Sequence, residues 1–285
     1  MKNVLLPTDF SGNSINAIHY ALACFKDVPC EFFVLHVQKT SGFISDDLMA
    51  MQASESVYES LVSTAKEKIE ALISNLKSIG NKDLHSFKSK VDYDNFIDAI
   101  NQVVEMASID MIVMGTQGES KLEKKLFGSN TIRVIQRVNC PIIAVPDNHE
   151  FRSLKTIGFS SNYESTYHPK DLEVLVQMAK LFNSAVYVIH VTNVHGLTKE
   201  QEKNKALLDT YLREINHSFV ELESDDVPEA IGSYITEQLM DLLAMTGKKH
   251  SFLERLFVRH TVEDFAFNLN VPLLVMEHKE SEVKA

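Results

Sequence analysis

The sequence predicts an α/β protein made of two tandem doubly wound, parallel five-stranded sheets that pack as a pseudo-twofold pair. Three observations lead to this prediction. The chain repeats itself, each copy alternates strand-like and helix-like segments, and each copy ends in a strongly apolar strand. Its 285 residues leave room for two ordinary domains with a core each.

The internal repeat is visible when the chain is laid on itself. A shift of 131 positions aligns Val91–Val145 with Leu222–Met276 without a gap, with Asp110 meeting Asp241 among the identities. The amino-terminal parts align with a larger shift, near 153, that brings His36 to His190. The second copy is therefore shorter by about twenty residues, which we attribute to a trimmed helix and connection.

The boundary between the copies is predicted in the polar stretch from 146 to 150. We therefore expect domains at 1–147 and 152–279. In the first copy, apolar runs of strand length lie at Asn3–Pro7, Phe32–Val37, Leu84–Val91, Ile109–Met114 and Cys140–Val145. Helical spacing of apolar residues lies at Ser11–Phe25, Ser54–Leu76, Asp94–Ala107 and Thr131–Val138.

This alternation predicts a parallel sheet with helices on both faces. Ser11 or Asn13 is the expected cap of the first helix. In such open sheets, ligands bind beyond the carboxyl ends of the strands. The residues that follow the first, second and fourth strands are therefore the first places to look for a site.

Composition excludes several classes of protein. The formal net charge of -11 argues against nucleic acid as a partner, because phosphate binding needs clustered Lys and Arg. No apolar stretch approaches the length of a membrane span, and the start of the chain is unlike a signal peptide. Cys24, Cys30 and Cys140 form no CxxC pair. We expect Cys24 and Cys140 to be reduced core residues of a cytoplasmic protein.

One glycine-rich segment follows the buried fourth strand. It runs Met114-Gly115-Thr116-Gln117-Gly118, then nine residues, then Gly128-Ser129-Asn130. Glycine allows close approach of the backbone to an anion, and a helix amino terminus favours negative charge. Lys121, Lys124 and Lys125 could add positive charge. The alternative is a plain turn followed by a helix cap.

This pattern resembles the ATP-binding signature of the universal stress protein family. Pro7-Thr8-Asp9-Phe10-Ser11, Leu35-His36-Val37 and Cys140–Val145 agree with that family as well. The resemblance implies an adenine nucleotide alpha hydrolase-like fold and ATP or AMP as the ligand, with Mg²⁺ near Asp9 left open. It implies nucleotide contacts at Pro7, Thr8, Asp9, Val37, Met114, Gly115, Gly118, Gly128, Ser129 and Asn130.

Three residues of these motifs also have a simpler interpretation. Asp9 could be a helix-capping or turn carboxylate, and Met114 a core residue that borders the pocket. His36 is expected to be a packed strand histidine rather than a ligand.

The second copy lacks the glycine pattern of the first copy. Gly115, Gly118, Gly128 and Ser129 become Thr246, Lys249, Arg259 and His260, and Pro7 and Asp9 become Ser160 and Asn162. Side chains then stand where phosphates would approach, so we expect one nucleotide site per chain, in the first copy. Members of the family commonly dimerise through their last strands. We expect the strands at Pro141–Val145 and Pro272–Met276 to pair within this chain, since an exposed apolar edge invites aggregation.

We therefore expect an adenine nucleotide-binding stress-response or signalling protein, with the nucleotide as a regulatory ligand. The alternatives are a nucleotide-free interaction scaffold and a slow ATPase. No GxxxxGK[ST] loop, GxSxG turn or HExxH helix is present, so we expect no enzyme and no catalytic residue, and no metal held by side chains apart from the open case of Asp9. A protein partner is expected but not identified, and further dimerisation is left open.

Overall fold

The computed structural model describes residues 1–38, 51–93, 95–116, 128–147, 149–192, 196–247 and 270–277, without the side chains of 51–62 and 277. The strands are β1 Lys2–Pro7, β2 Cys30–Val37, β3 His85–Asp92, β4 Met111–Gly115, β5 Ile142–Val145, β6 Thr156–Ser160, β7 Ala185–Thr192, β8 His217–Glu223, β9 Leu242–Gly247 and β10 Leu273–Glu277. The helices are α1 Gly12–Cys24, α2 Met51–Ile79, α3 Phe96–Met106, α4 Ser129–Arg137, the 3₁₀ turn η1 Pro169–Asp171, α5 Glu173–Phe182, α6 Lys199–Leu212 and α7 Val227–Glu237.

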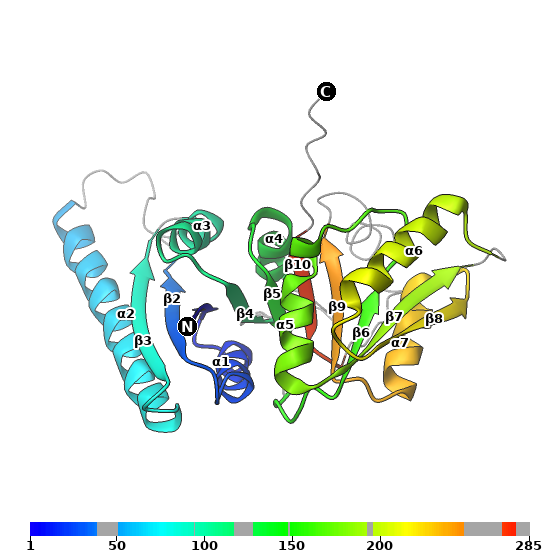
Figure 1. Cartoon of the computed structure of the whole chain (residues 1–285). Coiled ribbons are helices and arrows are strands. Elements are labelled where there is room, and N and C mark those ends of the chain that lie inside the picture. The colour runs from blue at the N-terminus through cyan, green and yellow to red at the C-terminus, as the bar shows by residue number, and fades with distance from the viewer. Residues whose placement is uncertain are drawn as a thin grey trace.

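The strands form one ten-stranded sheet in the order β3-β2-β1-β4-β5-β10-β9-β6-β7-β8. The two copies lie side by side along this sheet (Figure 1). Within each copy the strands are parallel, as the alternating pattern predicts. The α/β fold class is confirmed. The predicted trimming is also present, because α2 has 29 residues and its counterpart α6 has 14.

The two halves of the sheet join through the last strand of each copy. β5 and β10 pair antiparallel, with Ile143 opposite Leu274 at the centre of the ladder. The predicted edge-to-edge pairing is therefore present, and each apolar edge is covered by the other copy. β5 ends at Val145 and β6 begins at Thr156. The domain limits at 147 and 152, which fall between these strands, stay a prediction.

Two apolar layers cover the faces of the sheet, and each layer draws residues from both copies. One layer contains buried residues of α1, α2, α5 and α6, such as Ile18 and Leu175. The other contains buried residues of α3, α4 and α7, such as Val134 and Ile231. This two-sided covering by helices is the doubly wound arrangement that the alternating segments predict.

The repeat extends to unusual backbone geometry. Phe10 and Tyr163 both have positive φ, at 62° and 55°, and they are equivalent under the shift of 153. Ser108 and Leu239 have φ of 47° and 49° and are equivalent under the shift of 131. Non-glycine residues rarely adopt such angles, so their recurrence at matching places supports the two alignments.

Candidate functional site

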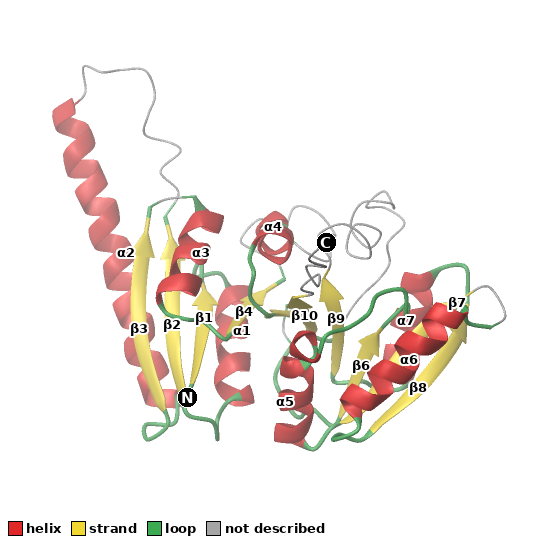
Figure 2. Cartoon of the chain, turned by 45° about the horizontal axis from the view of Figure 1, so that its top comes forward, coloured by secondary structure: helices red, strands yellow, loops and turns green. Residues whose placement is uncertain are grey.

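The ends of β1 and β4 mark the point where the strand order of the first copy reverses. β1 lies between β2 and β4. The helix that follows β1, α1, packs on one face of the sheet, and the helix that follows β4, α4, packs on the other. Figure 2 shows the arrowheads of β1, β2 and β3 at the same edge of the sheet. Ligand crevices in open α/β sheets lie at such a reversal, beyond the carboxyl ends of the strands.

The loop from β1 to α1 is ordered by its own side chains. The Oδ1 atom of Asp9 accepts hydrogen bonds from Ser11 N at 3.0 Å and Ser11 Oγ at 2.5 Å. Ser11 in turn caps α1 by accepting from Ser14 N, so Ser11 rather than Asn13 is the cap. Thr8 is buried and its hydroxyl lies 2.9 Å from Ser14 Oγ. Asp9 is exposed and orders the turn, so the role of turn carboxylate is present, while its contact with a nucleotide stays a prediction.

His36 is a packed strand histidine, as expected. It is buried, and its Nδ1 atom lies 2.8 Å from the carbonyl oxygen of Thr8. Its ring lies 4.6 Å from that of Phe10, measured between centroids. Val37, the predicted adenine-side residue, is half-buried at the end of β2 and packs against the layer of α3 and α4.

The end of β4 brings Met114 and Gly115 to the same edge. The Met114 side chain is buried in the layer of α3, α4 and α7, so it is a core residue next to the site. Gly115 also lies against another part of the protein, besides its predicted contact with the nucleotide. A Cβ atom there would lie 1.7 Å from Oδ1 of Asn13, so the close approach of α1 leaves no room for a side chain unless Asn13 moves.

The start of α4 is fixed beside the end of β4. Gly128 N donates to the carbonyl oxygen of Thr116 at 2.6 Å, and Thr131 Oγ1 donates to the carbonyl oxygens of Gly115 and Thr116 at 3.0 and 3.2 Å. The N-cap is Gly128, which provides no side-chain cap, and the first turn has no acidic residue. Ser129 and Asn130 are exposed and begin the helix, two residues earlier than predicted. Backbone N–H groups at such an end attract anions.

The structure therefore brings Pro7, Thr8 and Asp9 to the same edge as Met114, Gly115, Gly128, Ser129 and Asn130, with Val37 at the neighbouring strand end. Gly118, Lys121, Lys124 and Lys125 lie outside the described residues. The sequence reasoning considered Asn13 only as a cap and missed it as part of the site. Its place in the first turn of the helix after β1 was the available signal.

In the second copy, a buried tyrosine lies at the equivalent place. Tyr167 stands where the first copy has Ser14, and its hydroxyl bonds to Ser161 Oγ at 2.9 Å and to the side chain of Thr246. Burial raises the pKa of the Tyr167 hydroxyl. Gln201 of α6 also donates to the carbonyl oxygen of Asn162 at 3.0 Å. Lys249, Arg259 and His260 lie outside the described residues.

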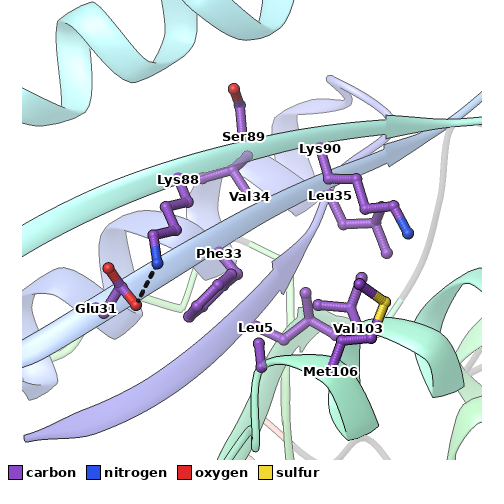
Figure 3. A pocket seen from close by; sticks show the side chains of 11 residues that line it. Leu5, Glu31, Phe33, Val34, Leu35, Lys88, Ser89, Lys90, Val103 and Met106 are labelled. Carbon is purple, nitrogen blue, oxygen red and sulfur yellow. Dashed lines mark hydrogen bonds and ion pairs between the residues drawn. The ribbon is translucent and has the colours of Figure 1, made fainter.

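A separate cavity of about 400 Å³ opens on the sheet face beside α3 (Figure 3). Its floor is formed by apolar residues of β1 and β2, including Leu5 and Phe33. Lys88 lies over the Phe33 ring, 5.2 Å from its centroid, and forms an ion pair of 2.9 Å with Glu31. The cavity lies along the middle of the strands and contains none of the predicted site residues.

Within the described part of the chain, no group of three or more His, Cys, Asp or Glu residues could hold a metal ion. No helix among the described residues has the length and apolar character needed to cross a membrane. Cys24, Cys30 and Cys140 are all buried thiols, and Cys140 Sγ donates to the carbonyl oxygen of Ile109 at 3.6 Å.

Comparison with known proteins identifies the family. The model of the universal stress protein family matches residues 1–146, so the chain belongs to this family. Universal stress protein MJ0531 of Methanocaldococcus jannaschii is 29% identical over 147 residues, which cover 50% of this chain and 81% of that protein. Universal stress protein Slr1230 of Synechocystis is 22% identical over 308 residues, 96% of this chain and 99% of that protein.

A solved structure extends the similarity of fold to the whole chain. The crystal structure of a universal stress protein from Archaeoglobus fulgidus aligns with a TM-score of 0.65 at 19% identity. The alignment covers 98% of this chain and 97% of that one. The tandem arrangement of this chain therefore has a structural counterpart in the family.

Proposed function

We propose that the chain is an adenine nucleotide-binding universal stress protein that acts in stress response or signalling, with ATP or AMP bound in the first copy. One observation carries this proposal. The amino terminus of α4 is held at the carboxyl end of β4 by Thr131, while Gly128 leaves it without a side-chain cap. A helix start with free N–H groups at this edge suits a phosphate.

The second copy supports a single site per chain. Its equivalent place is filled by Tyr167, which bonds to Ser161 and Thr246. A buried tyrosine with satisfied hydrogen bonds would have to leave before a nucleotide could enter. We therefore propose a stoichiometry of one nucleotide per chain.

We further propose that the nucleotide is held rather than turned over. The Oδ1 atom of Asp9, the one candidate base, accepts two hydrogen bonds from Ser11 and thereby orders the β1–α1 turn. Its exposed carboxylate fits the outer coordination of Mg²⁺, which favours one or two carboxylates together with phosphates. Phosphate release at no more than a slow rate is expected with ATP. Rapid release would favour the ATPase alternative.

The test uses two substitutions at the N-cap of α4. Gly128 has φ of -67° and ψ of 157°, which other residues adopt freely, so Gly128→Ser and Gly128→Asp should both fold and cap the helix. Gly128→Asp also places a negative charge where phosphate would sit. We expect wild type to bind one ATP or AMP per chain by calorimetry, Gly128→Asp to lose binding, and Gly128→Ser to lose less.

Gly118→Arg, in the segment between the glycines, is expected to abolish binding as well. Phe33→Ala, in the separate cavity, serves as the control and should leave affinity unchanged. Mass spectrometry of small molecules released from the freshly purified, denatured protein provides an independent readout. Two equivalent sites, no binding, or equal binding by wild type and Gly128→Asp would contradict the proposal.

A further inference from the structure

We propose that Asn13 contacts the bound nucleotide directly, and that its carboxamide pairs with a ribose hydroxyl. This assignment rests on the proposed nucleotide site. It adds a residue that the glycine pattern does not contain and names the part of the ligand that the residue recognises.

The first argument is an unsatisfied polar side chain. Asn13 is only 6% exposed, and neither its Nδ2 nor its Oδ1 atom has a hydrogen-bond partner among the residues that the structure describes. Buried amide groups are nearly always paired, because removing them from water without a partner is costly. An unpaired buried amide in a native chain requires an explanation, and a ligand bound beside it supplies one.

The second argument is the position of this side chain. Asn13 lies in the first turn of α1, next to Ser14, whose hydroxyl is bonded to Thr8 at the end of β1. Its Oδ1 atom lies so close to Gly115 that no Cβ fits between them. The amide therefore lies against the end of β4, at the edge of the sheet where the strand order reverses and a ligand is expected.

The chemistry of the amide selects the ribose. A carboxamide has donor hydrogens on Nδ2 and an acceptor at Oδ1, and a hydroxyl can satisfy both kinds of group. A phosphate offers acceptors only and would leave Oδ1 unpaired. The phosphates are assigned to the start of α4, which Thr131 ties to Gly115. The ribose is the next group along the nucleotide, so it is the hydroxyl-bearing part within reach of Asn13.

The second copy provides an internal comparison. Thr166 takes the place of Asn13, and its hydroxyl donates to Oδ1 of Asn204 at 3.2 Å. Asn204 is 3% exposed, and its Nδ2 atom donates to the carbonyl oxygen of Tyr163 at 2.8 Å. A deeply buried asparagine in this fold can thus pair both its Nδ2 and its Oδ1 atom. The copy without the glycine pattern has neither the unpaired amide nor the glycine opposite it.

The test measures the affinity of wild type, Asn13→Ala and Asn13→Asp for ATP, 2′-deoxy-ATP and 3′-deoxy-ATP by calorimetry. We expect wild type to prefer ATP over at least one deoxy analogue by about tenfold, the effect of one well-placed hydrogen bond. Asn13→Ala should bind ATP about tenfold more weakly and lose this preference. Asn13→Asp keeps the shape of the side chain and loses the donor, so it should also lose the preference for ATP over the deoxy analogue. This variant covers the case in which the alanine variant does not fold.

Thermal unfolding without nucleotide separates this role from a structural one. Asn13→Ala breaks no hydrogen bond in the protein, so its midpoint should equal or exceed that of wild type. The matched control Asn204→Ala breaks two bonds, so its midpoint should fall while its nucleotide affinity stays unchanged.

The outcomes distinguish the assignment from the proposed function. Failure of wild type to bind any of the three nucleotides overturns both. Binding by wild type together with unchanged affinity in Asn13→Ala overturns the role of Asn13 alone. A uniform loss of affinity that keeps the preference between ATP and the deoxy analogues also overturns the ribose assignment and indicates a phosphate contact.

Discussion

Ile143 of β5 and Leu274 of β10 are antiparallel partners at the junction of the two copies, and both are fully buried. Leu274→Ala should therefore lower the free energy of unfolding by about 2 to 5 kcal/mol, as large-to-small changes in a core do. Urea unfolding followed by circular dichroism checks this. The control is Leu239→Ala, at a side chain that is 83% exposed, with an expected change within about 0.5 kcal/mol.

The shared apolar layers predict how the chain unfolds. Each layer contains buried residues of both copies, so the two halves should unfold together in one transition by circular dichroism and fluorescence. Two separate transitions, assigned to the two copies, would show that the junction contributes little.

Because Asn13 and Gly115 are in contact, we expect substitutions at these two residues to have coupled effects on stability. Gly115→Ala forces a Cβ atom against Oδ1 of Asn13 and should cost about 1 to 3 kcal/mol of stability. The double variant Gly115→Ala/Asn13→Ala removes the clashing amide and should regain most of that loss. A double-mutant cycle from urea unfolding measures the coupling, and strictly additive effects would contradict the contact.

His149 predicts a dependence of stability on pH. Burial lowers its pKa, and its Nδ1 atom lies 2.8 Å from the carbonyl oxygen of Asn270, just before β10. Arg152 also lowers the pKa, whereas the Asn270 bond and Asp241 oppose the shift. The unfolded chain therefore binds the proton more tightly than the folded chain.

The stability that neutral His149 contributes is thus present above the unfolded pKa of about 6.5 and decreases as pH falls below it. Comparison of wild type with His149→Gln at pH 7.5 and pH 5.5 isolates this contribution. The wild type should lose more stability over this interval than the variant. Equal losses would remove His149 as the cause.

We expect the cysteine thiols to react slowly with labelling reagents in the native protein. Cys24, Cys30 and Cys140 are buried thiols, and burial raises the pKa of Cys30 to about 11 and that of Cys24 still further. Thiolates are therefore scarce at neutral pH. Ellman's reagent should react with none of the 3 thiols in the native protein and with all of them in denaturant. Fast reaction of one thiol in the native state would contradict its burial.

Much of the fold follows from patterns that are local in the sequence. Apolar periodicity located the strands and helices within a few residues, because the two faces of each element differ in burial. The self-alignment located the two copies, and the apolar last strands predicted their pairing, since a strand with such an edge must be covered. The glycine spacing located Gly115 and Gly128, which the structure brings to one edge.

The sequence by itself determined the repeat, the order of elements and the edge of the sheet at which to expect a ligand. Tertiary structure alone decided which atoms meet there. Asn13 meets Gly115, and Tyr167 meets Thr246, through contacts between elements distant in the chain. No local pattern encodes such distances. They arise only when α1 and the matching segment of the second copy pack against the sheet, and this packing leaves the Asn13 amide unpaired and buries Tyr167.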